Sequence, residues 1–71
     1  ENQKEQRRLA RRLEQLEAQI EDLDSQISQL QEAMEATNDA AELMESQQQI
    51  DQLTAAQEEA MLEWEELAEK V

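Results

Sequence analysis

The sequence of 71 residues contains no cysteine, glycine, proline or histidine, and Trp64 is its single aromatic residue. Without cysteine there are no disulfide bonds and no thiolate metal sites. Without glycine and proline few tight turns are expected, which argues against β structure because sheets need frequent chain reversals. A core centred on aromatic side chains is excluded as well, and a chain of this length buries little surface.

The same absences leave little chemistry. No glycine-rich loop is present to bind phosphate, and the serines lack the histidine that usually activates them. Glu59, Glu63 and Glu66 share one helical face and could hold a divalent cation weakly through oxygen. Acid–base catalysis would need burial that separates their pKa values, so a solvated face is the simpler interpretation. We predict no catalytic residue, no metal site and no cofactor in this chain.

Charge is distributed very unevenly. The formal net charge is −13, and between Leu13 and Glu69 there are only acidic residues among the charged ones. Such asymmetry predicts one contact end and one solvated end. No apolar stretch is long enough to span a membrane, and because the chain begins at Glu1 rather than Met we expect residues 1–71 to be one fragment of a larger protein. The basic residues are Lys4, Arg7, Arg8, Arg11 and Arg12 near the beginning, with Lys70 near the end.

The first half of the chain has a regular apolar repeat. Strong helix formers dominate the composition. Large apolar residues recur at alternating steps of four and three, the heptad pattern of a coiled coil. This 3.5-residue period predicts left-handed supercoiling. The first seam consists of Leu9, Leu13, Leu16, Ile20, Leu23, Ile27, Leu30 and Met34.

The repeat stops over residues 35–42, which contain no large apolar side chain. In the absence of glycine, Asn38 is the best available residue for a left-handed helix end. Asp39 and Glu42 have the spacing of a capping box, and acidic residues stabilise a helix N-terminus. We predict a turn at about residues 37–40, formed by Thr37, Asn38 and Asp39.

A second, less regular seam follows the break. Ser46 and Gln57 occupy two of its positions, and Gln57 could either specify the register or form a weakly packed layer. Trp64 lies at a core position, where packing is favoured over a role as an anchor for a partner. The apolar members of this seam are Leu43, Ile50, Leu53, Ala60, Trp64, Leu67 and Val71.

Two seams joined by a short break can fold back within one chain, or continue as one straight helix in a parallel dimer. The break at Asn38 and Asp39 favours folding back. We therefore predict an all-α fold, an antiparallel two-helix coiled-coil hairpin with helices at about residues 2–36 and 40–70. Because such a hairpin buries its own seams, we expect it to be monomeric.

The pairing of the two helices has two candidate registers. One places Leu9 opposite Val71, and the other places Leu9 opposite Trp64 with Arg12 near Glu63. A buried apolar side chain stabilises by about 1.5–3 kcal/mol, whereas an exposed ion pair contributes about 0–1 kcal/mol. The first register shelters more apolar surface, so it is favoured.

The four arginines near the beginning form one stripe through their i, i+4 spacing. Positive charge at a helix N-terminus is disfavoured by the helix dipole, so the stripe needs another explanation. One explanation is pairing with Glu63, Glu65, Glu66 and Glu69, which the hairpin brings alongside. The other is contact with nucleic-acid phosphate or an acidic protein surface. No aromatic residues interleave with the stripe, which argues against base stacking.

Two stretches resemble a known family. The opening Lys4–Arg7 segment, which enters a Leu/Glu/Arg heptad, is similar to the entry of the C-terminal extension of ABC-F proteins. The Glu63–Leu67 segment resembles the end of that extension. The resemblance covers nearly the whole chain and includes a turn where the family has one. The acidity from Leu13 onward departs from the family and argues against DNA binding by residues 13–69.

The resemblance implies a non-catalytic coiled-coil arm of a soluble, cytoplasmic tandem ATPase that acts on the ribosome. ATP and Mg would belong to the parent protein, since none of its ATPase motifs lie here. The extension of some members is regarded as DNA-binding. Contact with ribosome or nucleic acid would involve the five basic residues, the hairpin tip, or both, and an acidic tip should prefer basic ribosomal proteins to bare RNA. The alternative is a structural or dimerisation coiled coil of an unrelated protein.

Overall fold

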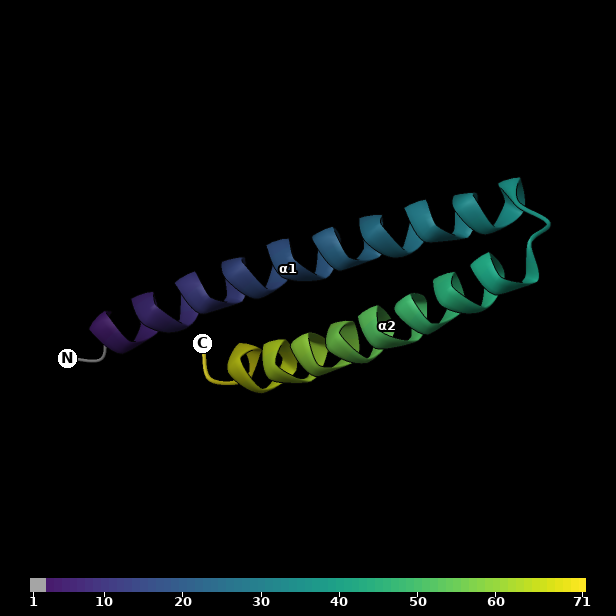
Figure 1. Ribbon diagram of the computed structural model, residues 1–71. Helices are drawn as coiled ribbons and strands as arrows, with labels where there is room; N and C mark the ends of the chain where they lie inside the picture. The colour runs from purple at the N-terminus through teal and green to yellow at the C-terminus, as the bar shows by residue number, and fades with distance from the viewer. Residues whose placement is uncertain (1–2) are drawn as a thin grey trace.

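The computed structural model describes residues 3–71 as two long helices, α1 (Gln3–Ala36) and α2 (Ala40–Ala68). Figure 1 shows them lying side by side in opposite directions, with both ends of the chain at one end of the molecule. The largest dimension is 59 Å and the other two are 14 and 12 Å. The predicted all-α hairpin is therefore confirmed. We call the end with the chain termini the base (residues 3–12 and 60–71) and the end at residues 37–39 the tip.

Packing along α1 follows the heptad repeat closely. Within the described part of this helix, every seam residue is buried or half-buried and every other residue is exposed. Leu16 and Leu23 are the most enclosed, and Leu16 is only 1% exposed. The 3.5-residue period keeps one face of α1 turned toward α2 from Leu9 to Met34, which is the reason for this regularity.

Packing along α2 is looser, as its sequence predicts. Ile50 and Ala60 are buried, while Ser46 and Gln57 occupy half-buried seam positions. The Gln57 side chain donates a hydrogen bond from Nε2 to the Ile20 carbonyl oxygen (3.2 Å), so this polar group inside the seam is satisfied. A polar residue is thus accommodated at the seam without an unpaired buried donor.

The end of α2 differs from the prediction. The helix stops at Ala68 rather than at residue 70, and the Lys70 amide donates to the Leu67 carbonyl (3.0 Å) in a tightened last turn. Val71 lies beyond this turn and is 59% exposed. The prediction that Val71 is a buried seam residue is therefore wrong, although the residue lies beside Arg7 and Ala10 of α1. The predicted start at residue 2 lies outside the described residues.

The tip is formed by residues 37–39, close to the predicted turn. Asp39 is the N-cap of α2, and its side chain accepts a hydrogen bond from the Ala41 amide (2.9 Å). The Thr37 hydroxyl accepts from the Asp39 amide (3.2 Å) and donates to the Glu42 carboxylate. Glu42 therefore does not complete a capping box, because Thr37 takes its place at the Asp39 amide.

Asn38 does not have the left-handed conformation that its sequence position predicted. No residue between 3 and 71 has a positive φ. The chain instead leaves α1 through an extended segment, in which Asp39 has φ −79° and ψ 118°. The hydrogen bonds of Thr37 to Asp39 and Glu42 stabilise this turn, so a left-handed residue is not required.

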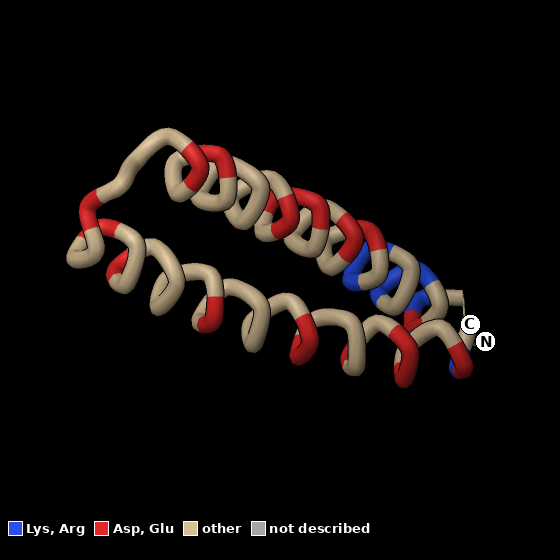
Figure 2. Tube along the Cα trace, turned by 90° about the vertical axis from the view of Figure 1, so that its right-hand side faces the viewer, with Lys and Arg blue, Asp and Glu red and all other residues tan. Residues whose placement is uncertain are grey.

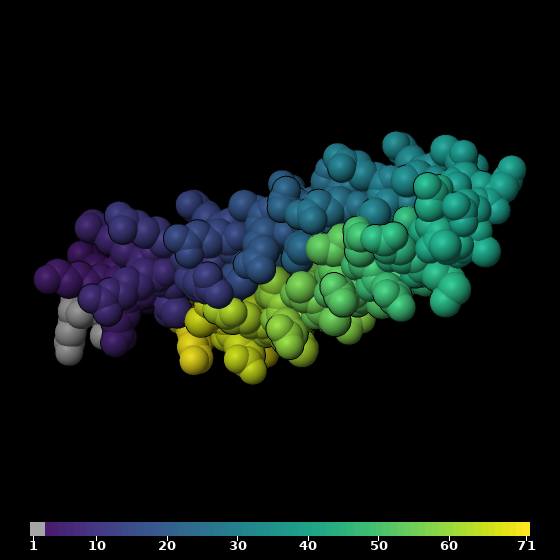
Figure 3. All heavy atoms as spheres, viewed as in Figure 1, coloured from purple at the N-terminus to yellow at the C-terminus, as the bar shows by residue number. Residues whose placement is uncertain are grey.

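Contacts between the helices follow the first of the two registers. Lys70 lies beside Leu9 at the base, and Leu30 lies beside Gln49 and Leu53 further along. α1 also extends past the C-terminal end of α2, so its first turns project at the base (Figures 1 and 3). Among the residues described, no helix is long and apolar enough to cross a membrane.

Candidate interaction site

The basic residues gather on one helix at the base. All five, from Lys4 to Arg12, lie in the first three turns of α1, and all are exposed. Figure 2 shows them as a blue cluster at the end that carries both termini, while acidic residues follow both helices elsewhere. The predicted contact residues are therefore brought together on one surface, which we call the basic base (Lys4, Arg7, Arg8, Arg11 and Arg12).

Arg12 joins this surface to α2. Its Nε and Nη2 donate to the two carboxylate oxygens of Glu63, at 2.7 and 3.0 Å. This two-point geometry is the strongest arrangement that arginine makes with a carboxylate. The hydrogen bond lowers the pKa of the Glu63 carboxyl and raises the pKa of the Arg12 guanidinium, and both effects exceed the opposing cost of desolvation.

This ion pair is the one that only the disfavoured second register predicted. Both side chains are long enough to meet diagonally across the helices, although the rest of the contacts follow the first register. Because both side chains are long, the Arg12–Glu63 ion pair does not by itself identify the register.

The other basic residues are not neutralised by α2. Within residues 3–71 the Arg12–Glu63 pair is the only ion pair, so the predicted pairing with Glu65, Glu66 and Glu69 does not form. The projection of α1 past the end of α2 explains this, because the first turns of α1 have little of α2 beside them (Figure 3). Most of the positive charge of the basic base is thus available to a partner.

Trp64 lies at the seam near the base and is half-buried. Its indole Nε1 donates to a carboxylate oxygen of Glu17 at 3.4 Å, a long and therefore weak hydrogen bond. The ring contributes apolar area to the helix interface while its N–H reaches the surface, as is common for tryptophan. This placement favours seam packing over a free anchor.

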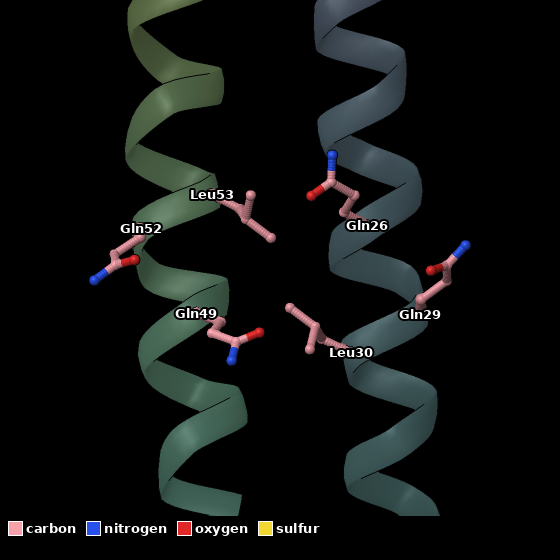
Figure 4. Close-up of a pocket in the computed structure, with 6 residues that line it drawn as sticks. All are labelled: Gln26, Gln29, Leu30, Gln49, Gln52 and Leu53. Carbon is pink, nitrogen blue, oxygen red and sulfur yellow. The ribbon is translucent and has the colours of Figure 1, made fainter.

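Between the base and the tip lies the part of the rod that we call the shaft (residues 13–36 and 40–59), and midway along it there is a shallow groove that no motif in the sequence predicted. Figure 4 shows Leu30 and Leu53 pointing toward each other between the helices, with the amide of Gln49 beside them. The groove is lined by Gln26, Gln29, Leu30, Gln49, Gln52 and Leu53, so no charged side chain borders it. Its members come from segments more than fifteen residues apart, and only the pairing of the helices brings them together.

The described residues hold no group of three or more potential metal ligands and no cysteine. They also contain no buried polar or charged residue. The arrangement is suited to binding through charge and shape.

The family model described as ABC transporter C-terminal domain matches residues 4–69. No curated protein and no solved structure matches the chain.

Proposed function

The chain belongs to the ABC transporter C-terminal domain family, and from this premise we propose that it is the non-catalytic interaction arm of an ABC-F ATPase. The family match covers both helices and the tip, so the whole hairpin corresponds to the domain. This membership disfavours the alternative of a structural coiled coil from an unrelated protein. ATP and Mg would be bound by the parent protein, in the cytoplasm, and not by this arm.

One observation carries the proposal: five of the six basic side chains lie on one exposed face at the start of α1, while acidic residues predominate along the rest of the rod. The basic base offers guanidinium groups, which bind phosphate through two N–H groups at once. The acidic shaft would repel phosphate, so a nucleic acid can approach this chain only at its base. We therefore propose that the base contacts the ribosome or another nucleic acid.

The tip provides a second contact of opposite sign. It lies at the far end of a rod 59 Å long, contains Asp39 and is flanked by Glu35 and Glu42. Such a tip should bind basic ribosomal proteins in preference to bare RNA. In this arrangement the rod sets the distance between a phosphate contact and a protein contact.

Binding of a fluorescent RNA duplex, measured by anisotropy over a range of salt concentrations, tests the role of the base. Arg7→Gln with Arg11→Gln should weaken binding at least tenfold and reduce the salt slope by about 0.9 for each phosphate that is no longer neutralised. The matched control is Gln31→Glu with Gln48→Glu, which lowers the net charge by the same two units on the shaft. The control should bind within about twofold of the unchanged chain, since its basic base is intact. Equal binding by all three proteins, insensitive to salt, would remove the role assigned to the base.

A further inference from the structure

The groove in the middle of the shaft belongs to a larger surface without charge. Residues 25–31 of α1 contain no charged side chain, and residues 46–57 of α2 contain only Asp51. The hairpin places these two segments opposite each other. On either side of them both helices are acidic again (Figure 2). We call the groove residues the neutral band (Gln26, Gln29, Leu30, Gln49, Gln52 and Leu53).

The neutral band has unused hydrogen-bonding capacity. Each glutamine amide can donate two hydrogen bonds and accept as many. Gln26 donates to Asp22 (2.8 Å), but within the described chain the amides of Gln29, Gln49 and Gln52 have no protein partner. Leu30 and Leu53 at the bottom of the groove are only half-buried. A surface of this kind is complementary to itself, because each amide matches another amide.

We propose that the neutral band binds the neutral band of a second copy of this chain, with the two rods crossing about a two-fold axis. Each copy carries a net charge of −13, so contact anywhere else along the shaft would set carboxylate against carboxylate. A crossing at the neutral band lets the acidic ends of the two rods diverge. Two-fold interfaces are made by the same patch on both subunits, which a self-complementary amide surface satisfies.

The predicted association is weak and depends on salt. The neutral band is small compared with a standard protein interface, so the dimer forms only at high protein concentration. It must also form against the mutual repulsion of the shafts, which salt reduces as the screening length falls from about 10 Å at 0.1 M to about 3 Å at 1 M. The closed seam by itself predicts a monomer, and this dimer adds to the hairpin without opening it.

Sedimentation equilibrium of the 71-residue chain at millimolar concentration tests the association without any nucleic acid present. At low salt the molar mass should be near 8.3 kDa, and at about 1 M NaCl it should rise toward twice this value as the charges are screened. A constant mass of one chain at both salt concentrations would overturn the proposal. So would a dimer that dissociates on adding salt, because opposite charges would then hold it together.

A matched pair of variants locates the contact. Gln29→Glu with Gln49→Glu places charge inside the neutral band and should weaken the association at least tenfold. Gln15→Glu with Gln19→Glu adds the same charge on the acidic part of α1, outside the uncharged segments, and should associate like the unchanged chain. Equal association of the two variants would show that the contact lies elsewhere.

Single cysteines supply a second measurement that does not depend on added charge, because the natural sequence has none. Gln49→Cys should form a disulfide-linked dimer on oxidation faster than Gln48→Cys, whose side chain does not line the groove. Equal rates would contradict the proposed crossing. The basic base takes no part in this contact, so the result is independent of whether the arm binds RNA.

Discussion

Among individual side chains, Arg12 and Glu63 have an unusual double role. Arg12 belongs by sequence to the basic base, yet its guanidinium is held by two hydrogen bonds to a carboxylate of the other helix. The pair therefore fixes the lateral position of the base while the neighbouring arginines remain unpaired by α2. Gln57 acts similarly inside the seam, where its amide is bonded to the opposite backbone. Both contacts link the helices through polar groups that also restrict their alignment.

The Arg12–Glu63 pair should be visible in the titration of a single carboxyl. The hydrogen bond from Arg12 lowers the pKa of the Glu63 carboxyl in the folded hairpin. The ion pair therefore stabilises the hairpin fully above the ordinary glutamate pKa of about 4.3. This stabilisation is lost as pH falls through the lower pKa of the folded state. Carbon-13 NMR of the Glu63 side chain should show this lowered pKa. In Arg12→Gln the pKa should move back up, and an unchanged titration would mean that the pair does not form in solution.

The two helices differ in how their ends and seams are specified. α1 has an unbroken seam and needs no help from its neighbours to define its buried face. α2 has polar residues at the seam positions Ser46 and Gln57, so its apolar packing against α1 is weaker. Hydrogen bonds at its first turn therefore matter more for its stability. The Asp39 cap supplies such a hydrogen bond, since it satisfies an amide that the first turn would otherwise leave unpaired.

Replacement of the cap should therefore weaken the whole hairpin through α2. We expect Asp39→Ala to lower the free energy of unfolding by about 0.5–2 kcal/mol, the usual effect of losing an N-cap side chain. Urea denaturation followed by circular dichroism measures this difference. Asp39→Ser is the matched control and should stay within a few tenths of a kcal/mol of the unchanged chain, because serine caps nearly as well. Equal losses of stability in both variants would show that capping is not what Asp39 contributes.

The whole molecule is a rod whose charge is divided along its length. The seams bury one narrow stripe on each helix, and most residues outside the stripes are exposed to water, with acidic residues predominating among the charged ones (Figure 2). Repulsion among these carboxylates opposes the folded state, because folding brings the two acidic helices side by side. The rod is consequently held together by its apolar seam in spite of its charge.

Thermal stability should therefore rise with ionic strength. The screening length shortens from about 30 Å at 0.01 M salt to about 10 Å at 0.1 M, which weakens repulsion between exposed carboxylates along the shaft. Circular dichroism melting curves at the two concentrations should give a higher Tm in the more concentrated salt. A lower Tm would mean that attraction at the Arg12–Glu63 pair outweighs the repulsion of the shaft.

Much of this structure is determined by the sequence alone. The heptad repeat specifies which residues of α1 are buried, because its period nearly matches that of the helix and so places all seam residues on one face. The gap in apolar residues around Asn38 places the turn, and the absence of glycine and proline argues against β structure. The Lys4–Arg7 and Glu63–Leu67 segments also point to a C-terminal extension of an ABC-type ATP-binding protein, and the match of residues 4–69 to the ABC transporter C-terminal domain confirms this coarser assignment.

Tertiary structure alone decided the remaining features. Periodicity allows two registers a heptad apart, and only the packing of both helices together chooses between them and leaves Val71 exposed. The Thr37 hydrogen bonds at the tip replace the expected left-handed Asn38, because side-chain geometry rather than residue type sets that turn. The neutral band and the unpaired arginines of the basic base likewise depend on which residues meet across the hairpin, a distance relation that a linear sequence does not contain.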